Sequence, residues 1–359
     1  MAVAVLLVSA AALVVLWVWI DSLRFADLDK RATAHLEAVK VASAIAVGGG
    51  GLFALYLAAR RQRTQELELE LRREELHGRD LDAAERRVTE LYAKAADQLD
   101  SDKAPVRLAG LFGLDRLADD NPRHRQMVID LVCAYLRMPH SSDDVKPDAE
   151  AEEREVRLAA QRMLAKRARP DLDPVTGVPR SLAWWSEIHE FNLSRARLID
   201  FDLSGCRLGK ADFTSATFVG TATFEKTEFR GETTFARAEF TGEVDFTAAV
   251  FLREASFERT GFRELAELDY ARFQDHVDFF KTQWSSGAWF ARARFDKSTE
   301  FGDALFAGAC FFNGAAFHGP ASFAATSFEG RADFDKAAFA QPASFDSAMF
   351  KFPVDLGTI

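Results

Sequence analysis

The sequence predicts an α+β chain of several domains, in which a transmembrane helical hairpin and a small helical segment precede a long β-solenoid. Three observations predict this order. An uncharged apolar stretch lies at the N-terminus, and a second one follows about twenty residues later. Over the last half of the chain, two series of large apolar residues interleave, and the members of each series recur at every eleventh position.

The composition narrows the classes of function. The chain has 32 Phe but only 4 Tyr, so its aromatic content supplies buried volume without a hydroxyl group. A net charge of -10 argues against a generic nucleic-acid binder, which would carry a basic patch. Cys133, Cys206 and Cys310 are widely spaced and odd in number, which favours small buried residues in a reducing compartment over disulfides or a metal site.

The first apolar stretch, residues 2–20, carries no charge and has Trp17 and Trp19 near one end. It is long enough to cross a hydrocarbon core of roughly 30 Å. A cleaved signal peptide is the alternative, but a basic n-region and a small-residue cleavage site before Asp21 are both missing. We therefore expect an uncleaved transmembrane helix.

A second helix is expected at residues 41–59, so that residues 1–59 form the hairpin. Small residues let helices approach closely in a bilayer, and we expect Ala44 and Gly48 to pack on residues 9–12. An arginine cluster directly after residue 59 favours the cytoplasmic side for the rest of the chain. The predicted location is a multi-pass protein of the cell membrane with a cytoplasmic C-terminal region, although the loop between the spans is also basic.

Residues 60–100 are rich in charges, with pairs such as Glu68 and Arg72 at helical spacing. We expect a solvated stalk helix there, and a dimerising coiled coil is the alternative.

Residues 101–169 predict a small helical domain. The pattern predicts an antiparallel helical hairpin that resembles a single HEAT-type pair, followed by a third helix at about residues 150–168. The three helices together are expected to bury one small core, and a spacer domain is their plainest role. Residues 170–190 are expected to be a linker that ends in a solenoid cap at residues 181–190, with Trp184 and Trp185.

The repeat dominates the C-terminal half. The first series runs through Phe213, Phe224, Phe235, Phe246, Phe257, Leu268, Phe279, Phe290, Phe301, Phe312, Phe323, Phe334 and Phe345. The second series runs through Phe218, Phe229, Phe240, Phe251, Phe262, Phe273, Trp284, Phe295, Phe306, Phe317, Phe328, Phe339 and Phe350. The residue two positions before each of these 26 is Ala 17 times, Thr six times, Val twice and Cys once. A narrow β-solenoid requires this pairing of one large and one small inward side chain, whereas a helix does not.

Four units centred on Leu193, Leu198, Leu203 and Leu208 lead into the two series at five-residue spacing. With units such as Ala211-Asp212-Phe213, residues 191–352 resemble the pentapeptide-repeat family, whose units read roughly small-Asp/Asn-Leu/Phe-x-x. The resemblance implies a right-handed quadrilateral β-helix with four faces per coil and the large and small residues inside. Residues 353–359 form the remaining tail.

This chain departs from strict fives after Phe218, because units of five and six residues alternate. A coil should then hold twenty-two residues instead of twenty. The extra residue is often glycine, and we expect it to bulge at a corner with positive φ. The glycines concerned are Gly220, Gly231, Gly242, Gly308, Gly319 and Gly330.

No catalytic, cofactor-binding or metal site is predicted. The seven histidines are scattered, and His276, beside Asp275, is expected in a surface loop. Cys206 and Cys310 take the small inward position. The sequence contains no nucleophile elbow, Walker motif or zinc-protease helix, so we expect a protein that is not an enzyme and has no cofactor.

These features predict a membrane-tethered, non-catalytic scaffold that presents the rod to an unidentified protein partner, without direct nucleic-acid binding. The alternative comes from the resemblance, since some family members mimic duplex DNA and bind type II topoisomerases. Residues 191–359 carry 24 acidic and 18 basic side chains, and this net charge of -6 is a weak field for a DNA mimic. A purely structural envelope role is a third hypothesis. The C-terminal end has no evident cap, and a homodimer, as in related solenoids, would cover it.

Overall fold

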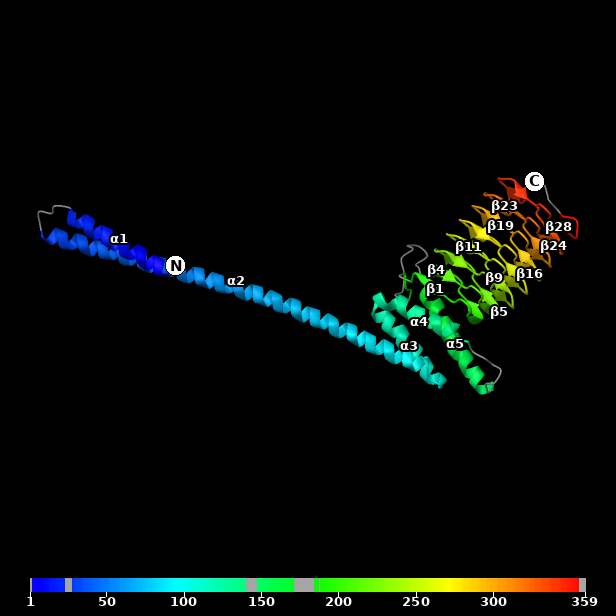
Figure 1. Cartoon of the computed structure of the whole chain (residues 1–359), viewed down its shortest axis with the longest axis horizontal. Coiled ribbons are helices and arrows are strands. Elements are labelled where there is room, and N and C mark those ends of the chain that lie inside the picture. The colour runs from blue at the N-terminus through cyan, green and yellow to red at the C-terminus, as the bar shows by residue number, and fades with distance from the viewer. Residues whose placement is uncertain (1, 23–27, 140–146, 171–183, 187, 355–359) are drawn as a thin grey trace. The chain divides into compact units, whose positions relative to one another are not determined.

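The computed structural model describes residues 2–22, 28–139, 147–170, 184–186 and 188–354. The chain divides into two compact units, Met1–Arg87 and Val88–Ile359. The first unit is entirely helical in its described part, and the second holds a small helical domain and the solenoid (Figure 1).

In the first unit, helix α1 (Ala2–Ser22) runs antiparallel to the first part of helix α2 (Leu28–Leu99), as Figure 1 shows. The rings of Trp17 and His35 lie 4.2 Å apart, and His35 Nε2 is 3.6 Å from Asp21 Oδ1. Ala38 and Ala42, one helical turn apart on α2, are buried in this contact region. Small residues thus lie where the two helices meet, as expected for a close helix pair.

The details of the predicted hairpin need correction. The chain is already helical from Leu28, so the second apolar stretch and the predicted stalk at residues 60–100 are parts of one continuous helix. The prediction that Ala44 and Gly48 pack on α1 is wrong: both are exposed, because the contacting face of α2 carries Ala38 and Ala42 instead. The expected pair of Glu68 and Arg72 is present at 2.9 Å.

Within the described residues, one helical segment is long and apolar enough to cross a membrane, Ala32–Glu70. A shorter apolar helical segment, Leu7–Ser22, belongs to α1. The apolar helix near the N-terminus is consistent with membrane association. The multi-pass arrangement stays a prediction.

The solenoid consists of short parallel strands, each paired with its counterparts in the adjoining coils. The first sheet contains β1 (Glu190–Asn192), β4 (Lys210–Asp212), β7 (Thr233–Thr234), β11 (Ala255–Ser256), β15 (Val277–Asp278), β19 (Thr299–Glu300), β23 (Ala321–Ser322) and β27 (Ala343–Ser344). The second contains β3 (Arg207–Leu208), β6 (Glu228–Phe229), β10 (Val250–Phe251), β14 (Arg272–Phe273), β18 (Arg294–Phe295), β22 (Ala316–Phe317) and β26 (Ala338–Phe339).

The third sheet supplies two faces, because β5 (Thr217–Thr223) bends around a corner and pairs with both β8 and β9. Strand β2 (Arg197–Asp202) pairs with β5 along both of these faces. One face also contains β8 (Glu239–Phe240), β12 (Gly261–Phe262), β16 (Gln283–Trp284), β20 (Leu305–Phe306), β24 (Ser327–Phe328) and β28 (Met349–Phe350). The other contains β9 (Val244–Asp245), β13 (Ala266–Glu267), β17 (Ala288–Trp289), β21 (Cys310–Phe311) and β25 (Ala332–Asp333).

The strand register confirms the predicted coil length. Phe251 pairs with Phe229 on one side and with Phe273 on the other, so the coil before it and the coil after it both have the predicted length. At the start of the solenoid, Phe191 pairs with Ala211, and this first coil has the shorter length of the strict five-residue repeat. The eight strands of the first sheet give a parallel β-solenoid of about seven turns.

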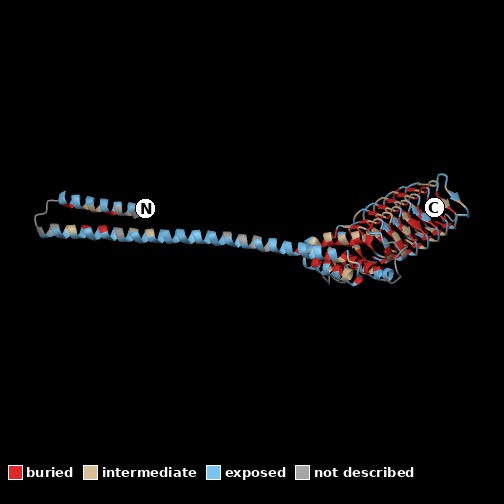
Figure 2. Ribbon diagram, turned by 60° about the horizontal axis from the view of Figure 1, so that its bottom comes forward, coloured by how far each residue is buried: buried red, intermediate tan, exposed pale blue. Residues whose placement is uncertain are grey.

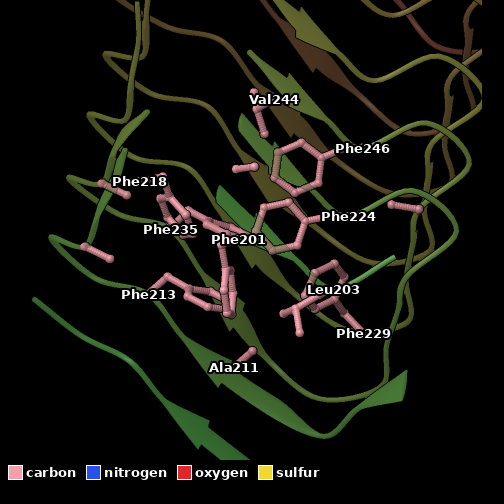
Figure 3. Close-up of a cluster of buried hydrophobic side chains, with 14 of the residues drawn as sticks. Phe201, Leu203, Ala211, Phe213, Phe218, Phe224, Phe229, Phe235, Val244 and Phe246 are labelled. Carbon is pink, nitrogen blue, oxygen red and sulfur yellow. The ribbon is translucent and has the colours of Figure 1, made fainter. Parts of the chain in front are cut away.

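Stacked phenylalanine rings fill the lumen, shown for the early coils in Figure 3. Phenylalanine rings one coil apart lie nearly parallel, from 4.3 Å between the centroids of Phe218 and Phe240 to 5.2 Å between Phe273 and Phe295. These distances match the spacing of about 4.8 Å between neighbouring strands. Across the lumen the rings meet edge to face, as Phe246 and Phe257 do at 5.7 Å. The interior of the solenoid is therefore closed and apolar (Figure 2).

The first coil divides its interior volume differently. Phe191 and Phe201 take the inward position that is small elsewhere, and leucines such as Leu203 take the large one. Both phenylalanines are buried, so the summed volume is kept while its distribution changes.

The corner glycines provide space instead of a left-handed backbone. Of the six glycines predicted to have positive φ, only Gly220 does, at +74°. The left-handed position lies two residues after each residue of the first series and accepts other types, such as Ala248 (φ 57°) and Lys281 (φ 58°). A Cβ atom on Gly330 would collide with the backbone of Gly308 one coil away. The close approach of successive coils therefore explains why glycine occupies position 330.

The helical part of the second unit is α3 (Ala104–Asp120), the 3₁₀ turn η1 (Pro122–His124), α4 (Arg125–Arg137) and α5 (Pro147–Ala168). Its buried residues belong to the same hydrophobic core as the lumen of the solenoid. Helix α4 packs against β1, and α5 packs against β2. The helical domain therefore covers the first coil, which is a more specific role than that of a spacer.

Two glutamine side chains extend the strand ladder beyond the first coil. The Gln161 amide donates to the carbonyl of Ile199 at 2.7 Å, and its oxygen accepts from the Ile199 N–H at 3.0 Å. On another face, the Gln126 amide donates to the carbonyl of Glu190 at 2.8 Å and its oxygen accepts from the N–H of His189 at 2.8 Å. Each side-chain amide makes the hydrogen bonds that a peptide group of a preceding coil would make. The backbone groups at the edge of the first coil therefore have hydrogen-bond partners.

Trp185 completes this end. Its ring is buried between the guanidinium groups of Arg125 and Arg167, and its N–H donates to Asp119 Oδ1 at 3.2 Å. Part of the cap predicted at residues 181–190, namely 181–183 and 187, lies outside the described residues.

Substituting Gln161→Leu should expose the first coil to local opening. Loss of both hydrogen bonds leaves the N–H and the carbonyl oxygen of Ile199 without the side-chain partner. This lowers the stability of the first coil by about 1 to 3 kcal/mol. We expect faster hydrogen exchange across residues 197–202, measured by mass spectrometry on the full chain. The matched control is Gln62→Leu on the exposed part of α2, which should leave exchange in the solenoid unchanged. Equal protection in both variants would contradict the role of Gln161.

Alanine at two glycine positions should change stability in opposite directions. Gly330→Ala should lower the free energy of unfolding by about 1 to 3 kcal/mol, because its Cβ atom has no room between coils. Gly113→Ala, in helix α3 with no atom closer than 4.0 Å to the added Cβ, should raise it by about 0.5 to 1 kcal/mol. Guanidinium-induced unfolding followed by circular dichroism measures both, and a neutral Gly330→Ala variant would refute the close-approach explanation.

Candidate interaction surface

The three thiols have packing roles. Cys133, Cys206 and Cys310 are all buried, and Cys206 and Cys310 take the small inward position in the lumen. Burial raises the pKa of Cys133 and of Cys206 to about 12, and it raises the pKa of Cys310 as well. At neutral pH these groups are uncharged thiols, which are poor nucleophiles.

His276 is held within the outer wall. It is half-buried, its Nδ1 lies 2.8 Å from Ser298 Oγ in the next coil, and its backbone N–H donates to Asp275 Oδ1 at 2.9 Å. Among the residues that the structure describes, no group of three or more potential metal ligands comes together.

All members of the two series line the lumen, and all but three of them are fully buried. The remaining three, Phe339, Phe345 and Phe350, are only partly buried because they belong to the last coil. Ring stacking continues to this end, where Phe350 lies 4.5 Å from Phe328. The series residues are thus structural, and contact with other molecules falls to the outer wall and to the last coil.

The last coil leaves an apolar hollow of about 590 Å³. Its lining residues are Phe339, Ala340, Gln341, Pro342, Ala343, Phe345, Phe350 and Val354. Met349 and Phe352 are exposed nearby in sequence. Gln126 and Gln161 form what we call the glutamine cap of the first coil. Within the described residues, the last coil has no counterpart of this cap.

On the outer wall, the residue immediately before each large inward residue points outward. On the face of β9, β13, β17, β21 and β25 this position forms a column in direct strand register, which we call the acidic-aromatic column. Its members in order are Asp245, Glu267, Trp289, Phe311 and Asp333.

The aromatic part of the column is partly exposed. The Trp289 and Phe311 rings meet edge to face, with 6.3 Å between their centroids, and Trp289 remains 37% exposed. They line a shallow hollow of about 280 Å³ together with Asp269, Ala291 and Asn313. The hollow therefore combines two aromatic rings with a carboxylate.

Asp245 and Glu267 of the column, and the adjacent Asp269, form no ion pair that the structure describes, whereas Asp333 at the other end of the column lies 3.1 Å from Arg331. Burial raises the pKa of Glu267, and neighbouring carboxylates, chiefly Asp245 and Asp269, raise it further. Burial also raises the pKa of Asp269, although a hydrogen bond from the N–H of Ala291 opposes this shift. No salt bridge in the described part of the chain reaches Asp245, Glu267 or Asp269.

Acidic side chains elsewhere on the wall are often neutralised by arginine. Asp296 lies 3.3 Å from Arg272 and 2.5 Å from Arg294, and these arginines keep its pKa low against the effect of burial. The column differs from such surfaces at Asp245 and Glu267, because these carboxylates and Asp269 repel one another and no described arginine is paired with them.

The sequence carries a signal for this column that was missed above. Trp289 directly precedes Phe290, and Phe311 directly precedes Phe312. Since successive side chains of a strand point to opposite faces, only one ring of each pair can enter the lumen. Doubled aromatics in such a repeat thus indicate an exposed ring.

Comparison with known proteins identifies the repeat. A family model described as pentapeptide repeats, nine copies, matches residues 203–250 and 301–349. No curated protein and no solved structure was found to match the chain.

Proposed function

We propose, on the premise that the solenoid belongs to the pentapeptide repeats, that this protein is a membrane-tethered, non-catalytic scaffold that presents its solenoid to a protein partner. The observation that carries the proposal is the closed, filled lumen, which leaves the outer wall and the last coil as the surfaces for recognition. Solenoids commonly use such extended surfaces for binding.

The wall suits a recognition role because its side chains are fixed in position. Each outward residue is held in register by strand pairing to the coils on both sides, as Trp289 is by Glu267 and Phe311. A surface ordered before binding loses little conformational entropy when a partner docks.

The membrane tether is supported by the apolar segment Ala32–Glu70 near the N-terminus. Arg60, Arg61 and Arg63 follow the second apolar stretch, and basic residues at the end of a span favour the cytoplasmic side. We therefore propose that the solenoid is displayed in the cytoplasm at the cell membrane.

We also propose that the last coil pairs with the same coil of a second copy. The apolar hollow there and the exposed edges of the last strands suit a self-complementary contact, in which both backbone and apolar groups are covered.

Proximity labelling in cells tests the scaffold. The full chain should label a defined set of proteins that is lost when residues 191–359 are deleted, because those residues provide the recognition surface. A chain lacking residues 1–59 is the control for tethering, and it should leave the membrane fraction after a carbonate wash. If the labelled set is unchanged without the solenoid, the scaffold proposal fails.

Sedimentation of the full chain in a nonionic detergent tests the pairing. We expect a dimer at micromolar concentration that becomes a monomer when Met349→Glu and Phe352→Glu are combined, because charge would be buried in the contact. Phe112→Glu, at an exposed aromatic residue on α3, is the matched control and should stay dimeric. A monomeric wild-type chain would exclude pairing through this end.

A further inference from the structure

We propose that the acidic-aromatic column, together with Asp269, is the docking site for an extended protein segment that carries arginine or lysine. The inference rests on the scaffold function and names the face and the chemistry of the partner.

Charge complementarity carries the first step. Glu267 and Asp245 lie in direct register in adjacent coils, and Asp269 follows two residues after Glu267. Each carboxylate lacks a salt bridge in the described part of the chain. The Lys226 ammonium group interacts with Asp245 at longer range, but it pairs with Glu225 at 2.6 Å. A cation placed here would relieve the mutual repulsion of the carboxylates.

The aromatic rings add a second requirement. A guanidinium or ammonium group is attracted to the face of an indole, and the stem of the side chain can cover apolar surface. Trp289 and Phe311 continue the column directly beyond Glu267, so a cation bound to the carboxylates lies next to an aromatic surface. An acidic surface that only imitated a nucleic acid would not need these exposed rings.

The same chain already contains a filled example of this chemistry. At the N-terminal end of the solenoid, the Arg167 guanidinium lies 4.5 Å from the Trp185 ring and also donates to Asp115 and Asp119 at 2.6 Å and 3.1 Å. Trp289 of the column, with Asp245, Glu267 and Asp269, presents the tryptophan and the carboxylates of that arrangement without a described arginine partner. We infer that the partner supplies it.

The spacing of the column can accommodate an extended segment. Successive positions of the column are separated by one strand spacing of about 4.8 Å, and alternate residues of an extended chain lie roughly 6.6 to 6.8 Å apart. A strand crossing the column at an angle can therefore place alternate basic side chains against Glu267 and Trp289. Its intervening side chains would face solvent.

Fluorescence anisotropy tests the proposal with the full chain in nonionic detergent. The probe is a labelled octapeptide of alternating arginine and serine, and an octapeptide of alternating glutamate and serine is its control. We expect binding of the arginine peptide only. The pair Glu267→Gln and Asp269→Asn should weaken it by about tenfold or more, and Trp289→Ala by about tenfold.

The matched control variant combines Asp278→Asn and Glu300→Gln. These two outward acids also lie in register in adjacent coils, on the face of β15 and β19, and removing them changes the net charge by the same amount. Binding should change by less than about twofold in this control. Equal weakening in both pairs, or no binding of the arginine peptide, would overturn the proposal. Unchanged circular dichroism verifies that each variant is folded.

Proximity labelling separates this inference from the scaffold function. If deleting residues 191–359 removes the labelled partners but Glu267→Gln with Asp269→Asn and Trp289→Ala retain them, the scaffold stands and the docking site is refuted. If the deletion leaves the set of labelled partners unchanged, the scaffold function is refuted. Loss of partners with the column variants, and not with the control pair, supports both.

Discussion

The structure depends on the agreement between two distances: the spacing of hydrogen-bonded strands and the stacking distance of phenyl rings. Rings such as Phe224 and Phe246 lie 4.7 Å apart and nearly parallel, so the same step that closes the backbone hydrogen bonds also packs the core. A narrow lumen then admits only a small second side chain on each face. Threonine satisfies this limit where its hydroxyl reaches a backbone carbonyl, as Thr227 does with that of Leu203 at 2.7 Å.

This regularity explains which parts of the fold the sequence could predict. The recurrence at every eleventh position determines both the inward positions and the length of the coil, because every coil has to fit the one before it. The role of Gln126 and Gln161 could not be read in the same way. A glutamine on an amphipathic helix carries no mark of the strand edge it will meet, and that partner is determined only when the helix packs on the first coil.

The corner glycines and the long helix show two other limits. Glycine permits both a left-handed backbone and a close approach, and the sequence alone does not say which of them a position requires. Gly231 and Gly330 serve close approach, whereas Gly220 has positive φ as well. In α2, Ala44 and Gly48 suggested a packing surface, while the continuation of the helix from Leu28 to Leu99 depends on its many other helix-forming residues. The candidate surface could have been predicted more easily from the sequence, since strand alternation alone places Trp289 and Phe311 outside the lumen.

The glutamine cap also limits how copies of this protein can assemble. Stacked strands are open to further addition at both ends unless something occupies the edge, and a rod with two free ends could grow into a fibre. Here Gln126 and Gln161 occupy the edge of the first coil, so head-to-tail growth has no acceptor. With one terminus blocked, strand addition can continue from the other end only, so the solenoid cannot extend head to tail into a filament through its strands.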